Sequence, residues 1–184
     1  ALNCMVTSGV KDIEYIAINT DAKALNNSKA ATKIQIGSKL TKGRGAGNKP
    51  EVGAKSAEEN RDEIEAALKG ADIIFITAGM GGGTGAAPVV AKIAQEQGIL
   101  TVATVTKPFH FEREQKMLQA ERGISELRKY VDSLIVIPNE KLLEGLDKTP
   151  TMRESFALAD DILKTGVKSI SDLITEEGYI NLDF

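Results

Sequence analysis

The sequence predicts an α/β domain with a doubly wound, mostly parallel sheet and helices on both faces. Five apolar, β-branched runs recur along the chain, and several are almost continuously apolar, as expected of parallel strands covered on both faces. Helical segments lie between most of these runs, and this alternation is typical of the fold. The strands expected from these runs are 13–19, 33–36, 73–77, 100–106 and 133–137.

Local signals place the helices. Ser56-Ala57-Glu58-Glu59 matches a capping box, Pro88 suits a first helical turn, and Gly98 suits a helix end. The first ten residues read as the tail of a helix. The longer helices expected are 56–70, 88–98 and 112–130.

A second capping box, Thr151-Met152-Arg153-Glu154, opens a long final helix that we expect over 151–177. At about 100° per residue, one narrow stripe of this helix carries mostly apolar side chains. Asp160 falls within that stripe, where a carboxylate is costly unless it is paired or hydrogen-bonded. The apolar members of the stripe are Met152, Phe156, Leu163, Val167, Ile170 and Ile174.

Composition narrows the class of protein. With 184 residues, 42% apolar and 27% charged, the chain fits one globular domain, and we expect a soluble intracellular protein. The single cysteine, Cys4, excludes a disulfide within the chain, and the single histidine, His110, argues against a histidine-rich metal site. A net charge of −3 without a dense Lys/Arg block argues against nucleic-acid binding. No apolar run reaches the roughly 18 residues of a membrane span.

The stretch AGMGGGTGAAP, residues 78–88, lies between an expected strand and an expected helix. It has three interpretations. It is a tight connection without a ligand, a dinucleotide-binding loop, or a cradle of backbone N–H groups for nucleotide phosphates at a helix N-terminus, with the Thr84 hydroxyl in place of a loop lysine. The dinucleotide interpretation expects an acidic residue about 20 positions later, and the next strand offers none.

The segment GGGTG after a strand resembles the signature of the tubulin/FtsZ family of GTPases. Other stretches agree with the FtsZ branch in order and approximate spacing: AINTDAKAL, GAGNKPEVG, TKPFHFE, IPNEKLL and GYINLDF. The resemblance covers essentially all 184 residues. It implies the family's Rossmann-like GTPase domain, 1–184, without its first strand, its first glycine loop or its second domain.

The resemblance also implies the nucleotide-binding residues. Asn19 and Asp21 would lie near the phosphates and Mg²⁺, although alone they read as an ordinary Asx turn. The segment Gly45, Ala46 and Gly47 would sense the γ-phosphate, and the α- and β-phosphates would be wrapped by Gly81, Gly82, Gly83, Thr84 and Gly85. Glu112 would bind the ribose, or else only favour a helix dipole. Asn139 would lie near the sugar and base, or else only cap a helix.

In the family the ring matching Phe156 stacks on guanine, and the carboxylate matching Asp160 accepts hydrogen bonds from the base. A carboxylate only accepts, and guanine presents two donors where adenine presents an acceptor, so such a site can reject adenine. The alternatives are a core phenylalanine and a solvated acid on the flank of the helix.

Asn181 and Asp183 match the start of the family's catalytic loop, 178–184, which enters the nucleotide site of the next subunit in a head-to-tail filament. The resemblance thus implies a GTPase that is completed by self-assembly, with GTP or GDP and Mg²⁺ as ligands.

Several features depart from the family pattern, including GAGNKP where GAGGNP is commoner. The phosphate loop is two residues short, Arg113 stands where glycine is common, and Lys116 stands where an arginine usually approaches the nucleotide. The second catalytic carboxylate lies beyond residue 184. We therefore expect a protein ending here to bind nucleotide poorly and to hydrolyse it hardly at all.

The resemblance implies a cytoplasmic filament that forms the division ring at mid-cell. The protein's own copies are the main partner and division-machinery proteins are further partners, with no nucleic acid and no insertion into membrane. Two other classes stay open: an NAD-dependent oxidoreductase, and a catalytically inert interaction module of the same fold.

Overall fold

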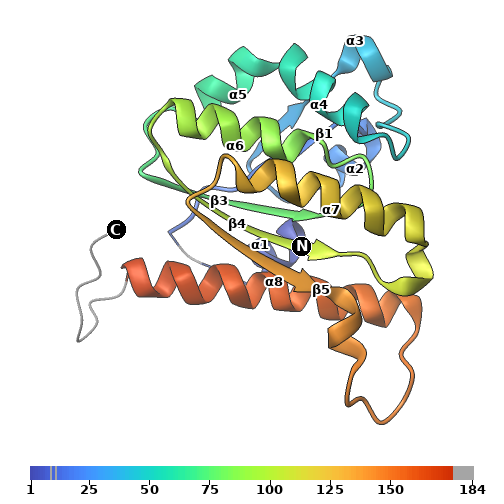
Figure 1. Cartoon of the computed structure of the whole chain (residues 1–184). Helices are drawn as coiled ribbons and strands as arrows, with labels where there is room; N and C mark the ends of the chain where they lie inside the picture. Colours follow the sequence, from blue (N-terminus) through green and yellow to red (C-terminus); the bar gives the residue numbers. More distant parts are fainter. Residues whose placement is uncertain (9, 11, 176–184) are drawn as a thin grey trace.

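The computed structural model describes residues 1–8, 10 and 12–175. Its strands form two parallel sheets (Figure 1). One sheet pairs β1 (Ile16–Asn19) with β2 (Thr32–Gln35), and the other has the order β3 (Ile73–Gly79), β4 (Leu100–Lys107), β5 (Ser133–Pro138). The five expected strands are therefore confirmed, and their bounds differ from the expected ones by a few residues at most.

Helices cover both faces of the larger sheet, as Figure 1 shows. The α6 and α7 helices lie on one face, and α8 lies on the other together with α1. The doubly wound α/β class is thereby confirmed. The helices are α1 (Leu2–Thr7), α2 (Ala22–Asn26), α3 (Ser38–Thr41), α4 (Pro50–Glu59), α5 (Arg61–Leu68), α6 (Ala86–Glu96), α7 (Glu114–Arg128) and α8 (Met152–Thr175), with 3-10 turns η1 (His110–Glu112) and η2 (Asn139–Leu143).

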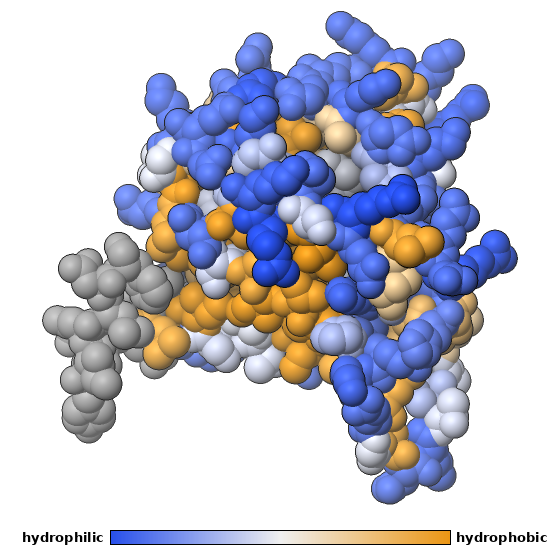
Figure 2. Space-filling model, viewed as in Figure 1, coloured by the Kyte–Doolittle hydropathy of each residue, from blue (hydrophilic) through white to orange (hydrophobic). Residues whose placement is uncertain are grey.

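Apolar side chains from both layers form the core. One cluster joins α4, α5 and α6 to β2 and includes Ile34, Ile64 and Ile93. A second cluster joins α6 and α7 to β4 and includes Val105 and Leu127. Figure 2 shows polar side chains over most of the visible face and an apolar region between α7 and α8. Among the described residues, no helix combines the length and the apolar character needed to cross a membrane.

The helix expected to open at Ser56 begins earlier, so that expectation is wrong. The α4 helix starts at Pro50, and Ser56 is a fully buried residue within it, with no hydrogen-bond partner for its hydroxyl oxygen. A proline at the first helical position is the start signal that applies here. Asn60 then separates α4 from α5, and its side-chain oxygen accepts the N–H of Gly37 at 2.8 Å.

The capping box at the start of α8 is confirmed. The Thr151 hydroxyl accepts the Glu154 N–H at 3.2 Å, and the Glu154 carboxylate accepts the Thr151 N–H at 3.2 Å. The expected core stripe is only half right. Leu163 and Val167 are buried, whereas Met152 is 61% exposed. The face of α8 that packs inward has small residues in register with these two: Ser155, Ala159 and Ser171.

Candidate functional site

The loops at the carboxyl ends of the strands meet along one edge of the molecule. Contacts link them in sequence. Asp21 after β1 bridges to Arg44, the Ala46 side chain touches the backbone of Gly83 after β3, and Gly81 lies against Pro108 after β4. Ligands of open α/β sheets bind outside these carboxyl ends, which makes this edge the candidate site.

Asn19 and Asp21 form a short turn at the end of β1. The Asn19 side-chain oxygen accepts the Asp21 N–H at 3.0 Å, and Asp21 accepts the Ala24 N–H at 3.0 Å as the cap of α2. The Asx turn weighed from the sequence is therefore present. The same turn places the Asp21 carboxylate beside Gly45, so these two candidate positions come together.

The glycine loop, residues 80–85 between β3 and α6, carries a run of free backbone donors. Within the described part of the chain, the N–H groups of Gly81, Gly82, Gly83, Thr84 and Gly85 donate to no protein acceptor. The α6 helix that follows has no side-chain cap at its N-terminus. Successive unpaired amides at a helix N-terminus favour a bound anion.

Two glycines of this loop are also required by packing. A Cβ at Gly85 would lie 1.8 Å from the Pro50 carbonyl oxygen. A Cβ at Gly83 would lie 2.6 Å from the Ala46 Cβ. The loop thus sits directly on the start of α4. Thr84 uses its hydroxyl inside the loop, where it donates to the Gly79 carbonyl at 2.8 Å.

The segment 45–48 covers the glycine loop from the other side. Gly45, Gly47 and Asn48 all adopt positive φ, and Ala46 is buried against the loop. Sequence reasoning missed Gln119 of α7, whose side-chain nitrogen, in the favoured orientation, donates to the carbonyls of Gly81 at 2.9 Å and Asn48 at 3.3 Å. One side chain therefore ties both loops to α7, and no local pattern marks it in the sequence.

Glu112 faces its own turn. Its carboxylate accepts the Phe109 N–H at 2.8 Å and lies 3.8 Å from the Lys116 amine. The structure therefore brings the candidates Glu112 and Lys116 together, with Glu112 in the capping role. Arg113, between them, has φ 90° and ψ 149°, a region nearly restricted to glycine.

Asn139 begins η2 and is 4% exposed. Its side-chain oxygen has no hydrogen-bond partner, so the helix-cap role weighed from the sequence does not occupy it. Beside it, the Glu140 carboxylate accepts the His110 N–H at 2.9 Å and holds η1 against η2. Because an unpaired buried acceptor is costly, a ligand donor at Asn139 would relieve that cost.

Phe156 sits in an aromatic cluster. Its ring meets Phe109 edge-on at 5.6 Å and Phe111 edge-on at 5.9 Å, and those two rings stack on each other at 4.9 Å. Phe156 is nevertheless 40% exposed, so part of its side chain is open to solvent. One turn later, the Asp160 side chain is 46% exposed and lies 2.9 Å from the amino group of Ala1. Asp160, which the sequence pattern placed on the core-facing stripe of α8, therefore lies on the flank of this helix.

Asn181 and Asp183 fall outside the described residues. Among the residues that are described, no group of three or more His, Cys, Asp or Glu side chains could hold a metal ion.

These parts divide the edge into two chemical halves. The half after β1 and β3 offers unpaired backbone N–H groups, which suit phosphate. The half after β4 and β5 offers an open aromatic ring, a carboxylate and an unpaired amide oxygen, which suit a planar base with hydrogen-bond donors.

Comparisons with known proteins find relatives of this chain. The model of the tubulin/FtsZ family, GTPase domain, matches residues 4–147. An empty FtsZ dimer from M. jannaschii is similar over 100% of this chain and 54% of its own, with 45% identity and a TM-score of 0.93. Two Haloferax volcanii structures share the fold at 22% identity: a GDP-bound CetZ1 monomer (TM-score 0.82, covering 96% of this chain and 57% of that one) and a GTPγS-bound CetZ2 protofilament (0.80, 92% and 54%). The chain thus spans about half the length of these proteins.

Proposed function

Because the chain belongs to the tubulin/FtsZ family through its GTPase domain, we propose that it binds GTP and GDP at the carboxyl edge of its two sheets. The glycine loop binds the phosphates, and the α8 flank binds the base. The whole protein hydrolyses GTP and assembles head to tail through copies of itself.

The run of unpaired amides at Gly81–Gly85 is the observation that carries this proposal. Anions gain hydrogen bonds there without displacing any protein acceptor. The field at the N-terminus of α6 adds to the attraction. A phosphate bound at this loop is also the natural ligand for Mg²⁺, which would neutralise charge on the phosphates.

Phe156 and Asp160 supply base selection. They lie one helical turn apart on α8 and so share a face. The exposed part of the ring stacks on the base, and the carboxylate accepts from the two donors of guanine. Adenine would bring an acceptor against the same carboxylate.

Hydrolysis and assembly belong to the whole protein. We propose that Asn181 and Asp183 begin a loop that positions water at the nucleotide of the next subunit. Phosphoryl transfer needs alignment and charge stabilisation more than covalent chemistry, so sharing its groups across an interface makes turnover depend on assembly. By this proposal the filament is a cytoplasmic one that forms the division ring together with division-machinery proteins.

Calorimetric titration of the chain with GDP, GTP and ATP, up to millimolar concentration, tests the binding step. Guanine nucleotides should bind and ATP should bind more weakly. Gly82→Pro removes one loop N–H and should weaken GDP binding about fivefold, the worth of one hydrogen bond. Gly82→Ala is the matched control, because a Cβ there meets only Asn48 Oδ1 at 3.5 Å.

Equal affinity for GTP and ATP, or GDP binding that Gly82→Pro leaves unchanged, would refute the assignment. The short loop and its packing on α4 favour one second candidate, an inert module that binds nucleotide without turnover. Phosphate release by the whole protein, measured against its concentration, separates the two. Activity per subunit should rise once filaments form, and a flat response near zero identifies the inert module.

A further inference from the structure

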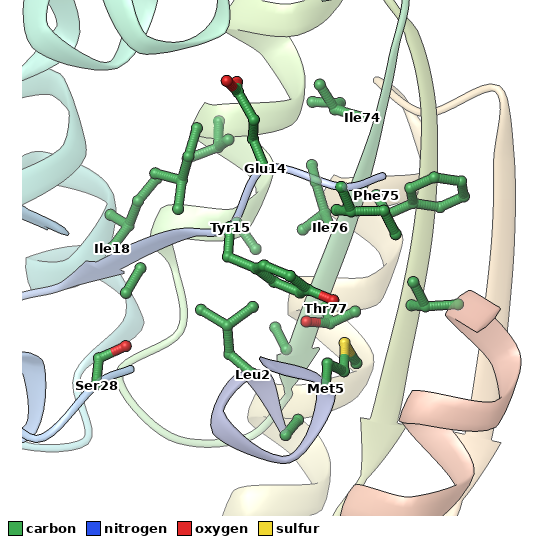
Figure 3. Close-up of a pocket in the computed structure, with 18 of the residues that line it drawn as sticks. Leu2, Met5, Glu14, Tyr15, Ile18, Ser28, Ile74, Phe75, Ile76 and Thr77 are labelled. Carbon is green, nitrogen blue, oxygen red and sulfur yellow. The ribbon is translucent and has the colours of Figure 1, made fainter. Parts of the chain in front are cut away.

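The glycine loop and the segment 45–48 meet at the carboxyl edge, but they follow different sheets. The glycine loop follows β3, and the segment follows the sheet of β1 and β2. In the described part of the chain, β1 and β3 do not pair, and Figure 3 shows a pocket between them, with Ile18 on one side and Ile76 and Thr77 on the other. Contacts beyond the strand ends therefore set how the two loops lie relative to each other.

Gln119 on α7 makes the polar contact that joins the two loops. In the favoured orientation its side-chain nitrogen donates to the Gly81 carbonyl at 2.9 Å and to the Asn48 carbonyl at 3.3 Å. Within the described residues, neither carbonyl accepts a hydrogen bond from another protein donor. The nitrogen of a primary amide carries two hydrogens, so one half-buried side chain can serve both acceptors.

The glycine loop also has anchors of its own. The Met80 N–H donates to the Thr106 carbonyl at 3.0 Å, and the Met80 side chain is buried. Next to it, the Lys116 carbonyl of α7 lies 2.7 Å from the place where a Cβ of Gly81 would be, and the far end of the loop is seated on the start of α4. The loop would therefore keep its place without the Gln119 side chain.

The segment 45–48 is held by fewer contacts. Its Ala46 side chain is buried against the glycine loop, and the Lys49 N–H closes a turn onto the Ala46 carbonyl at 3.1 Å. At Gly47, by contrast, no other part of the described chain lies within 4 Å of the place where a Cβ would be. The hydrogen bond from Gln119 is therefore a larger share of what holds the segment than of what holds the glycine loop.

The segment carries unpaired backbone donors, as the glycine loop does. Within the described residues, the N–H groups of Ala46, Gly47 and Asn48 donate to no protein acceptor. Gly47 and Asn48 both have positive φ, and successive amides in turns of this kind form concavities that bind anions. If the glycine loop binds phosphates as proposed, the segment that covers it offers donors to one phosphate more.

We propose that Gln119 is a positioning residue of the nucleotide site, which fixes the segment 45–48 at the spacing from the glycine loop that a triphosphate needs and so favours GTP over GDP. This inference rests on the proposed function. Gln119 acts through two backbone carbonyls and leaves the N–H groups of both loops free for phosphate. Without it, the segment must be ordered when the ligand binds, and that cost falls on the ligand that uses the segment.

Gln119→Met tests the role, because it keeps the length and the helix propensity of the side chain and removes both N–H groups. Calorimetric titration of the chain with GDP and with GMPPCP, a GTP analogue that resists hydrolysis, measures the two affinities in the presence of Mg²⁺. The affinity for GMPPCP should fall about fivefold, the worth of one hydrogen bond, and the affinity for GDP by less than about twofold. Gln115→Met is the matched control, since Gln115 is exposed one turn earlier on α7, and it should change neither affinity.

Hydrogen exchange without nucleotide tests the link between the loops separately from binding. In Gln119→Met, the Lys49 amide, which closes the turn of the segment, should exchange about fivefold faster than in the native chain. The Met80 amide, which bonds to β4, should keep its native rate. Unchanged exchange at Lys49 would overturn the proposal.

The outcomes separate this inference from the proposed function. A native chain that binds neither nucleotide refutes the proposed function, and the positioning role falls with it. A native chain that binds both, with equal losses of GDP and GMPPCP affinity in Gln119→Met, overturns the positioning role alone. If circular dichroism shows that Gln119→Met unfolds, Gln119→Ala gives the same comparison, because alanine has the highest helix propensity. A native ratio of the two affinities in that variant overturns the inference.

Discussion

Arg113 holds a backbone conformation that costs stability, and glycine at this position is expected to recover part of that cost. Its φ of 90° and ψ of 149° lie in a region nearly restricted to glycine. Surrounding bonds fix this geometry. The Arg113 N–H donates to His110 at 3.2 Å, and its carbonyl accepts from Lys116 at 3.2 Å and Met117 at 3.4 Å.

The magnitude follows from two opposing terms. A residue held in such a region costs roughly 1–3 kcal/mol. Glycine loses more freedom on folding, which offsets roughly 0.5–1 kcal/mol of the gain. Arg113→Gly should therefore raise the free energy of unfolding by about 1 kcal/mol, and Tm by about 2–4 °C for a chain of this size.

Urea denaturation followed by circular dichroism measures the change. Arg113→Ala is the matched control, because it removes the same exposed side chain and keeps the strain, so its stability should stay near that of the native chain. Equal stability of the glycine and alanine variants would show that the conformation carries no strain and would refute the reasoning.

Four further predictions follow from single contacts. Gly85→Ala should destabilise the chain by more than about 1 kcal/mol in urea denaturation, because the Pro50 carbonyl lies where the new methyl must go; a neutral result would mean that α4 moves freely. Thr151→Ala should cost about 1 kcal/mol through loss of the α8 cap, and a helix content and Tm that do not change would contradict this. Asp160→Ala should cut GTP affinity with an unchanged circular dichroism spectrum, and unchanged affinity would remove Asp160 from the site. Burial raises the pKa of Tyr15 above its ordinary 10.0. As pH rises, the unfolded chain therefore loses the Tyr15 proton before the folded chain does. The contribution of Tyr15 to the free energy of unfolding is complete below about pH 10 and should be lost as pH rises through the folded pKa. Tyr15→Phe should not show this loss of stability.

The strands were predictable from the sequence because each is a short apolar run with its own local signal. The cap at Thr151 was predictable for the same reason, since both partners lie within four residues. Ser56 shows the limit of this approach. Its residues match the capping-box pattern, but the helix begins six residues earlier at Pro50. Tertiary packing buries Ser56 beside Gly37.

The candidate site could be predicted as a set of loops at strand ends, and the contacts within it could be predicted less well. The side chains of Glu112 and Asn19 accept hydrogen bonds from neighbouring backbone N–H groups, and a sequence motif does not show these contacts. On α8, the inward face is set by small residues such as Ala159, and Gly166 passes near Thr104 on β4. A prediction based on the spacing of large apolar residues alone therefore put Phe156 on the core-facing stripe, although it lies beside that stripe.

The seating of the glycine loop on α4 has a mechanical consequence. Where backbone meets backbone without an intervening side chain, as at Gly53 against the carbonyl of Gly83, there is no flexible group to absorb a displacement. If the loop binds an anion as proposed, a shift of its backbone on binding would be transmitted directly to α4. The position of α4 would then depend on whether the proposed site is occupied.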